Sequence, residues 1–464
     1  MDDNAWSPSD TVGTLPAGGG LPSDIAARLD RLPLSGWHRR MVVLIGLGSF
    51  FNFFEVALGS FFGVLLSTQW SLTTLDKSLI IGSAYVGEMI GSLLLAPLAD
   101  RFGRRTLFQI NLLSYAALSL ATAFSPSLAV FLVLRVLTGI GLGAELTLVD
   151  TYLSELLPAA RRGRYIAWSY TFGLLAVPLA GVLSKAANGT ILGIAGWRWL
   201  LIVATAGGLA VWLTRRRLPE SPRWLAAAGK AVEADRVATA IERDVRATSR
   251  STPAEQTPAE PAATRPQGDA VAPDRYRQRA VLMWVMQILG PIGFYGFASI
   301  APLVLLAKGF DLSHSLSYAA LTAFGYPVGS LLSVYLTERL ERRTLLIASS
   351  LAIAAFGVLF GLSTGGGLVI AAGIATTIST VVQSNISHIY QAELFRTANR
   401  STAIGIPYAA SRLVSTLLPF VALTLLAAIG AGGLYTCCAL LLVAMTVVIR
   451  ILGPRTNNQR LDTI

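Results

Sequence analysis

Long apolar stretches dominate this chain of 464 residues and leave few folds open to it. About 20 consecutive apolar residues suffice for a helix to cross the hydrocarbon core of a bilayer. Because 53% of the residues are hydrophobic and only 14% are charged, the composition is that of a polytopic membrane protein. We predict an all-α membrane protein with twelve transmembrane helices, at residues 40–67, 77–99, 106–123, 127–156, 163–186, 197–214, 280–307, 314–336, 344–362, 366–391, 402–427 and 431–452.

The basic residues predict how the chain is threaded through the membrane. All but six of the 37 Lys and Arg residues fall in the termini and in the loops on one side. Basic loops stay in the cytoplasm, so we predict that both termini are cytoplasmic. The net charge of +11 therefore reports topology, and no nucleic-acid partner is expected. The first 36 residues lack a continuous apolar core, so we expect no cleavable signal peptide.

Two pairs of charged motifs recur at one spacing and indicate an internal repeat. DRFGRR begins at Asp100 and ELLPAARRG at Glu155; ERLERR and ELFRTANRS follow them at Glu338 and Glu393, both at the same distance along the chain, which we call the repeat spacing. A duplicated unit places a substrate site near the membrane midplane, between the repeats. We predict a mostly disordered cytoplasmic segment (1–36), a six-helix half (37–214), a cytoplasmic linker with surface helices and a disordered stretch (215–278), a second six-helix half (279–452) and a cytoplasmic tail (453–464).

The same motifs place acids beside bases at the predicted inner ends of the helices. Such charge networks can join the two halves in one state and separate in another. Ordinary basic loops on the inner side are the alternative explanation. We expect the gating residues to be Asp100, Arg104, Glu155, Arg162, Glu338, Arg342, Glu393 and Arg400.

Three motifs resemble the major facilitator superfamily and its sugar-porter-like branch: the DRFGRR loop at Asp100, RVLTGIGLG at Arg135 and PESPRWL at Pro219. Three further stretches resemble bacterial niacin transporters: IAARLDRLP beginning at Ile25, FNFFE ending at Glu55 and GAELTLVDTYLSEL beginning at Gly143. Those are related to synaptic vesicle glycoprotein 2 and to aromatic-acid/proton symporters. The resemblance implies two pseudo-symmetric six-helix halves that transport a small molecule.

Charged residues inside the predicted helices need an explanation, because each costs roughly 2.5–3.5 kcal/mol at a helix centre. The resemblance implies that Glu55 faces Arg135, and a carboxylate that loses such a partner in a cavity takes up a proton. We therefore expect proton coupling at Glu55 and Arg135, with a permanently paired ion as the alternative. Glu145 and Asp150 could line the cavity or pair with a neighbouring helix, and we include both as proton-coupling candidates.

Arg412 has no acid within its own predicted helix, and a guanidinium can hold a carboxylate through two hydrogen bonds. In anion-carrying relatives an arginine at the like position serves the substrate. Pairing with a helix end or with an acid on the first or fourth helix is the alternative. Aromatic and amide side chains would complete a site for a small planar anion: Asn52, Phe54, Trp168, Tyr170, Tyr295, Tyr326, Gln383, Asn385 and Tyr408.

These observations predict a proton-coupled symporter in the bacterial inner membrane that imports a small aromatic monocarboxylate by alternating access. Nicotinate is the first candidate, on the resemblance. A benzoate-like or shikimate-like acid, a sugar, and a non-transporting sensor on the same fold are the alternatives. The sequence shows no nucleophile–base set, phosphate loop or Cys/His cluster, so we expect no enzyme, cofactor or metal site. We expect a monomer.

Overall fold

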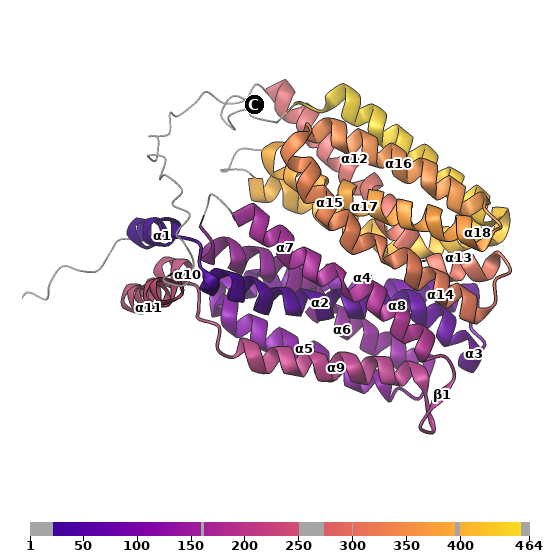
Figure 1. The fold of residues 1–464 in the computed structure, drawn as a ribbon, viewed down its shortest axis with the longest axis horizontal. Coiled ribbons are helices and arrows are strands. Elements are labelled where there is room, and N and C mark those ends of the chain that lie inside the picture. Colours follow the sequence, from indigo (N-terminus) through magenta and orange to yellow (C-terminus); the bar gives the residue numbers. More distant parts are fainter. Residues whose placement is uncertain (1–21, 159–161, 250–272, 299, 395–399, 456–464) are drawn as a thin grey trace, which may run out of the picture.

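The computed structural model describes residues 22–158, 162–249, 273–298, 300–394 and 400–455. Helices run along the long axis in two groups, which we call the N-terminal half and the C-terminal half (Figure 1). The N-terminal half contains α2 (Gly36–Leu65), α3 (Ser67–Trp70), α4 (Thr74–Phe102), α5 (Arg104–Ala123), α6 (Leu128–Leu156), α7 (Arg162–Leu174), α8 (Ala176–Ala186) and α9 (Gly196–Arg215). Before α9, β1 (Thr190–Ile191) and β2 (Ile194–Ala195) pair antiparallel as a small hairpin.

The C-terminal half contains α12 (Pro273–Ala298), α13 (Ala301–Ala307), α14 (Leu312–Ala323), α15 (Gly325–Arg339), α16 (Arg342–Leu362), α17 (Gly366–Leu394) and α18 (Arg400–Leu452). Gly430 interrupts α18 with a non-helical backbone conformation (φ 68°), so this element consists of two helices in succession. The described residues hold ten helical segments long and apolar enough to cross a membrane, and Leu128–Gly143 of α6 is a shorter apolar helix. The count of twelve transmembrane helices and the position of the termini stay predictions.

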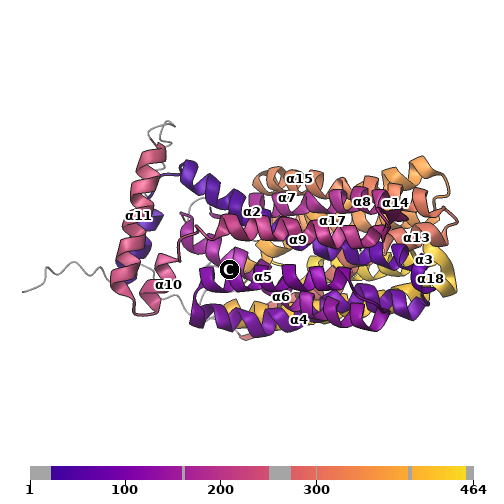
Figure 2. The same ribbon diagram turned by 90° about the horizontal axis from the view of Figure 1, so that it is seen from below.

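Three further helices lie at one end of the bundle: α1 (Pro22–Asp30), α10 (Pro222–Ala227) and α11 (Ala231–Ser249) (Figure 2). We call this the terminal end, and the opposite end, with α3, α13 and the hairpin, the far end. The sequence predicted no helix before residue 36, but α1 forms because Ile25 and Leu29 pack in a buried core shared with α11. Arg28 also bonds Asp235 at 2.6 Å and Glu242 at 2.8 Å. The stretches predicted as disordered lie mostly outside the described residues.

Close backbone contacts recur in the two halves at the repeat spacing. In α4, a Cβ on Gly87 or Gly91 would lie 2.1 Å from the carbonyl oxygen of Val136 or 1.9 Å from that of Ile140. In α15, a Cβ on Gly325 would lie 2.8 Å from the carbonyl oxygen of Ile374, and a Cβ on Gly329 would lie 2.7 Å from that of Ile378. Glycine alone allows helices to pack this closely. The repeat seen in the charged motifs therefore extends to the packing of the helices.

The buried cores show where the two halves are joined. A large apolar cluster at the far end includes Phe62 and Ile81 of the N-terminal half and Leu303 and Leu426 of the C-terminal half. Toward the terminal end, one cluster lies within the N-terminal half with α1, α10 and α11, and another within the C-terminal half. The halves thus share a core at the far end and have separate cores at the terminal end.

Candidate functional site

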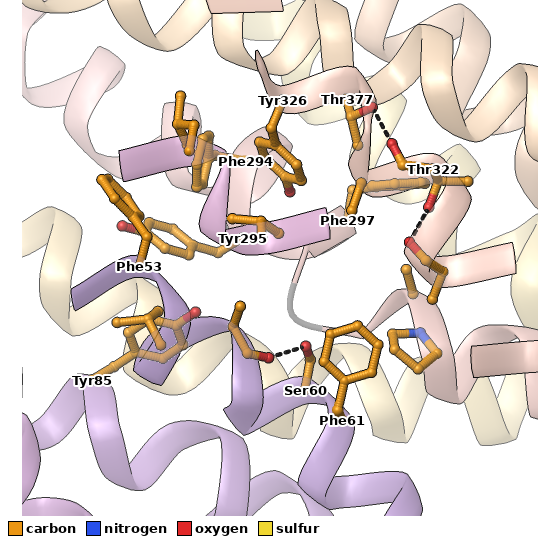
Figure 3. Close-up of a pocket in the computed structure, with 18 of the residues that line it drawn as sticks. Phe53, Ser60, Phe61, Tyr85, Phe294, Tyr295, Phe297, Thr322, Tyr326 and Thr377 are labelled. Atoms are coloured by element: carbon orange, nitrogen blue, oxygen red, sulfur yellow. Dashed lines mark hydrogen bonds between the residues drawn. The ribbon is translucent and has the colours of Figure 1, made fainter. Parts of the chain in front are cut away.

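A cavity of about 80 Å³ lies between the two halves (Figure 3). Its walls come from α2, α4, α7 and α8 on one side and from α12 to α15, α17 and α18 on the other. Most of its lining is apolar or aromatic, and the charged residues in the lining are Glu88 and Arg412. A mostly apolar cavity with a few polar groups is typical of a small-molecule site.

Arg412 of α18 is held in the cavity wall by three residues. Its Nη1 donates to Glu88 Oε2 of α4 at 3.0 Å and to the Tyr295 hydroxyl of α12 at 2.9 Å. Its Nη2 donates to the Tyr408 hydroxyl at 2.5 Å. Arg412 thus has an acidic partner, but this acid lies on the second predicted helix and not on the first or the fourth. The ion pair with Glu88 joins the two halves at the cavity.

Glu55 and Arg135 lie together, as the resemblance implied. Arg135 Nη1 donates to Glu55 Oε2 at 3.1 Å, and Arg135 Nη2 donates to the Glu55 backbone oxygen at 3.3 Å. The Ser119 hydroxyl donates to the second carboxylate oxygen. Both charged side chains are 1% exposed, and neither is among the residues that line the cavity. The pair is thus closed off inside the N-terminal half in this state.

Glu145 was expected either to line the cavity or to pair with a neighbouring helix, and in the structure it pairs with a neighbouring helix. Arg215 of α9 donates to Glu145 Oε1 at 2.6 Å, and Asn111 of α5 donates to Oε2 at 3.3 Å. Arg215 also donates to the backbone oxygen atoms of Leu44 and Ile45 in α2. Its guanidinium lies directly against the backbone of Gly48. Both charged side chains are fully buried. This ion pair ties α6, α9 and α2 together and does not line the cavity.

The motif predicted to form a gate in the N-terminal half makes a contact network at the terminal end. Arg104 at the start of α5 bonds Glu155 at 3.1 Å, near the end of α6. Glu220, from the PESPRWL motif, accepts hydrogen bonds from the backbone N–H groups of Arg104 and Arg105. A carboxylate at this position satisfies the free N–H groups at a helix N-terminus. In the second half, Arg342 donates to the backbone oxygen of Thr337 at 2.9 Å.

The predicted substrate residues divide into two groups. Asn52, Tyr295, Tyr326 and Arg412 line the cavity, whereas six others do not. Of these six, Phe54 packs in the apolar core, Trp168 is 38% exposed on α7, Tyr170 packs against Phe53, Gln383 is buried in α17, Asn385 donates to Ser333, and Tyr408 holds Arg412. The prediction that Trp168 and Phe54 line the substrate cavity is corrected. Their positions around their helices turn Trp168 outward and Phe54 into the apolar core.

Several predicted side chains lie outside the described residues, although their backbones belong to described helices or adjoin them. They are Asp100, Asp150, Arg162, Glu338, Glu393 and Arg400. Their proposed roles stay predictions.

Several residues of these charge and aromatic clusters were not predicted, among them Glu88 and Tyr85 of α4 and Arg215 of α9. Glu88 carries the same signal as Glu55, an acid within an apolar stretch. Arg215 lies in a basic run, Arg215 to Arg217, that reads as a loop on the inner side. Its burial depends on the position of α2 and α6 beside α9, which local sequence does not give.

Comparison with known proteins fits this arrangement. The family model described as "Sugar (and other) transporter" matches residues 41–464. The chain belongs to this family. Among its relatives, the putative metabolite transport protein YyaJ of Bacillus subtilis is 28% identical, over 95% of this chain and 97% of the relative. The niacin transporter NiaP of Acinetobacter baylyi is 26% identical, over 95% and 99%.

A solved structure shows the same fold. The xylose transporter XylE from E. coli, in a partially occluded inward open conformation, superposes with a TM-score of 0.73 at 19% identity, covering 92% of this chain and 100% of XylE. This member of the sugar and other transporter family is thus a multi-pass membrane transporter with the major facilitator fold.

Proposed function

We propose that the protein is a proton-coupled symporter that imports a small aromatic monocarboxylate, with nicotinate as the first candidate. The observation that carries this proposal is Arg412, a cation in the wall of an aromatic cavity between the two halves. Its guanidinium can bind a carboxylate through charge-assisted hydrogen bonds. The niacin transporter of A. baylyi is a relative over nearly the whole chain, which supports the same substrate.

The aromatic lining suits a flat ring. Phe53, Tyr85, Phe294, Tyr295 and Tyr326 surround the cavity in Figure 3, and aromatic side chains stack on one another in edge-to-face contacts. A pyridine or benzene ring can pack among them in the same geometry.

One hydroxyl in this lining, that of Tyr326, lacks a hydrogen-bond partner in the part of the chain that the structure describes. Tyr326 is 3% exposed, and its buried hydroxyl has no partner among the described residues. Figure 3 shows this hydroxyl pointing into the cavity. A buried donor without a partner costs free energy, so a ligand that accepts from it gains affinity. The ring nitrogen of nicotinate is such an acceptor, whereas benzoate has none at that position.

A sugar is the second candidate, because the fold neighbours include a xylose transporter. Three cavity hydroxyls, however, already donate to backbone oxygen atoms: Ser60 to Ala57, Thr322 to Ala319 and Thr377 to Thr322 (Figure 3). The Asn52 amide donates to the Leu142 carbonyl. Few donors are left for the several hydroxyls of a sugar, which favours an aromatic acid. A benzoate-like or shikimate-like acid, or a sensor that binds without transport, stays an alternative.

Alternating access follows from the way the halves meet. They share a core at the far end and separate toward the terminal end, so we assign this state as inward-facing, with the terminal end in the cytoplasm. Arg104 and Glu155 are part of the proposed gate at that end. The Glu55–Arg135 pair is closed here, and it must open in another state if Glu55 is to carry a proton. We further propose a monomer in a bacterial inner membrane, without enzymatic activity.

Uptake into proteoliposomes tests this function. The full chain is reconstituted and offered labelled nicotinate, benzoate, shikimate and xylose with and without an imposed pH gradient. We expect nicotinate to accumulate above its equilibrium level only when the outside is acidic. Accumulation of xylose but not of the acids would support the sugar alternative, and saturable binding without uptake would support a sensor.

A further inference from the structure

The ion pair between Glu88 and Arg412 occupies the position where a substrate anion would bind. Both side chains line the cavity, and Glu88 Oε2 takes one hydrogen-bond position of the Arg412 guanidinium at 3.0 Å. The remaining side-chain hydrogen bonds of Arg412 go to the hydroxyl groups of Tyr295 and Tyr408, which are neutral. His388 of α17 is a further titratable group within electrostatic reach of Arg412. A carboxylate that binds Arg412 from the cavity must therefore replace Glu88 or share the guanidinium with it.

A displaced Glu88 finds no second free arginine or lysine among the described residues around it. The groups that face it are Arg412 of α18, Arg135 of α6 and Tyr295 of α12, with Tyr85 one turn away on α4. Arg135 acts on Glu88 electrostatically but already holds the carboxylate of Glu55. The charges of two acids, Glu55 and Glu88, balance those of two bases, Arg135 and Arg412. A bound substrate carboxylate adds a third negative charge. Glu88 is 5% exposed, so leaving it charged and unpaired would be strongly unfavourable.

The internal repeat shows that the fold does not require this ion pair. At the repeat spacing, Glu88 corresponds to Tyr326 and Arg412 to Leu174. Tyr326 and Leu174 belong to one apolar cluster that also joins the two halves. Of two pseudo-equivalent contacts between the halves, one is thus apolar and the other is charged. A contact that architecture alone would allow to be apolar points to a function for the charges.

We propose that Glu88 and the substrate carboxylate compete for Arg412, and that the displaced Glu88 takes up one proton from the water of the cavity. The substrate brings one negative charge and the proton one positive charge, so the net charge of the site is unchanged. Glu88 Oε1, buried and without a hydrogen-bond partner among the described residues, is free to hold the proton. This proposal rests on the proposed function and links proton uptake to substrate binding itself, whatever Glu55 contributes during the conformational change.

Proton uptake on binding tests the proposal without transport. The detergent-solubilised full chain is titrated with nicotinate in weak buffer with a pH indicator, at a mildly alkaline pH. We expect about one proton taken up per nicotinate bound, and a Kd that rises about tenfold per pH unit. Glu88→Gln should bind nicotinate with no proton uptake and no pH dependence, and at high pH more tightly than the parent, because the competing charge is gone.

Two further variants serve as controls, one for misfolding of Glu88→Gln and one for the loss of a carboxylate outside the cavity. Glu88→Asp keeps a carboxylate that titrates, so proton uptake should persist even if Glu88→Gln folds poorly. Asp311→Asn is a matched control outside the cavity, since Asp311 is an exposed cap of α14. Hydrogen bonds from His314 hold the pKa of Asp311 below its ordinary value, so this carboxylate stays ionised and the control should match the parent.

The outcomes separate this proposal from the proposed function. Nicotinate binding without proton uptake in the parent, or undiminished proton uptake in folded Glu88→Gln, overturns the role of Glu88 and leaves the substrate assignment intact. A parent that binds neither nicotinate nor benzoate overturns the proposed function, and the competition at Arg412 with it.

Discussion

The carboxylate of Glu88 on α4 and the guanidinium of Arg412 on α18 form an ion pair that joins the two halves of the molecule at the cavity. Along the same two helices, the Ser78 hydroxyl donates to the Pro419 carbonyl, and Gly82 lies against Phe420. The packed seam between α4 and α18 thus ends at the candidate substrate site. A change in that ion pair acts directly on the contact between the halves.

Arg412 should dominate the affinity for the anion. Arg412→Ala should weaken nicotinate binding by about 10- to 100-fold, because a charge-assisted hydrogen bond contributes about 1.5–3 kcal/mol. Arg412→Lys should lose less, since a point charge replaces the planar fork. Isothermal titration calorimetry measures both, with nicotinamide as the uncharged control ligand. Equal affinity of the parent for nicotinate and nicotinamide would argue against charge recognition.

Tyr326 should distinguish nicotinate from benzoate. Tyr326→Phe removes only the hydroxyl, so nicotinate affinity should fall about three- to tenfold, the effect of one hydrogen bond. Benzoate affinity should stay nearly constant, because benzoate offers no ring acceptor. Competition binding with labelled nicotinate gives both values. A parallel loss for the two acids would mean that Tyr326 acts through packing alone.

The Glu145–Arg215 pair should contribute to stability. Glu145→Gln leaves a fully buried guanidinium without its counterion, which should cost about 3–5 kcal/mol. Replacing both residues with apolar ones, as in Glu145→Leu with Arg215→Met, should recover most of that loss. Thermal unfolding in detergent compares the three proteins. If the single variant is as stable as the parent, the pair contributes little.

Arg104 should affect the rate of transport more than affinity. Its guanidinium bonds Glu155 and the Ala99 carbonyl at the terminal end, away from the cavity. Arg104→Gln should slow exchange of labelled for unlabelled nicotinate several-fold, while binding changes by less than about twofold. Proteoliposome exchange and equilibrium binding give the two quantities. Lost affinity with normal exchange would place Arg104 outside the gate.

Close packing between α4 and α6 should make Gly87 intolerant of a side chain. Gly87→Ala would place a Cβ 2.1 Å from the Val136 carbonyl oxygen, so the helices must separate. We expect little folded protein in fluorescence-detected size-exclusion chromatography. Gly367→Ala is the matched control, since a Cβ there meets nothing within 4 Å. Equal yields of the two variants would contradict the close contact.

The sequence was sufficient for much of the fold because apolar length, charge placement and the repeat are local signals. They predicted the extents of most long helices, and the repeat spacing of the charged motifs recurs in the glycine contacts. The resemblance brought Glu55 and Arg135 together correctly. The helix α1 was missed because its nine residues are held by packing against α11. Arg28 of α1, for example, bonds Glu242 of α11, which lies 214 residues further along the chain.

The site was only partly predictable, because it depends on which face of each helix turns inward. Tyr295, Tyr326 and Arg412 reach the cavity, whereas Trp168 turns outward. Arg412 has no acid within its own predicted helix, so the sequence did not identify its partner. Its partner is 324 residues away, on the other half. Periodicity within one helix does not give such contacts; they require the packing of the halves.

The Glu55–Arg135 pair also has a consequence for biosynthesis. Its members are 80 residues apart along the chain, so α2 leaves the ribosome well before α6 is made. At about 5–20 residues per second, Glu55 waits roughly 4–16 s for its counterion. A carboxylate cannot enter lipid cheaply in its charged form. It follows that α2 must enter the bilayer with Glu55 protonated, or remain beside the insertion machinery until α6 arrives.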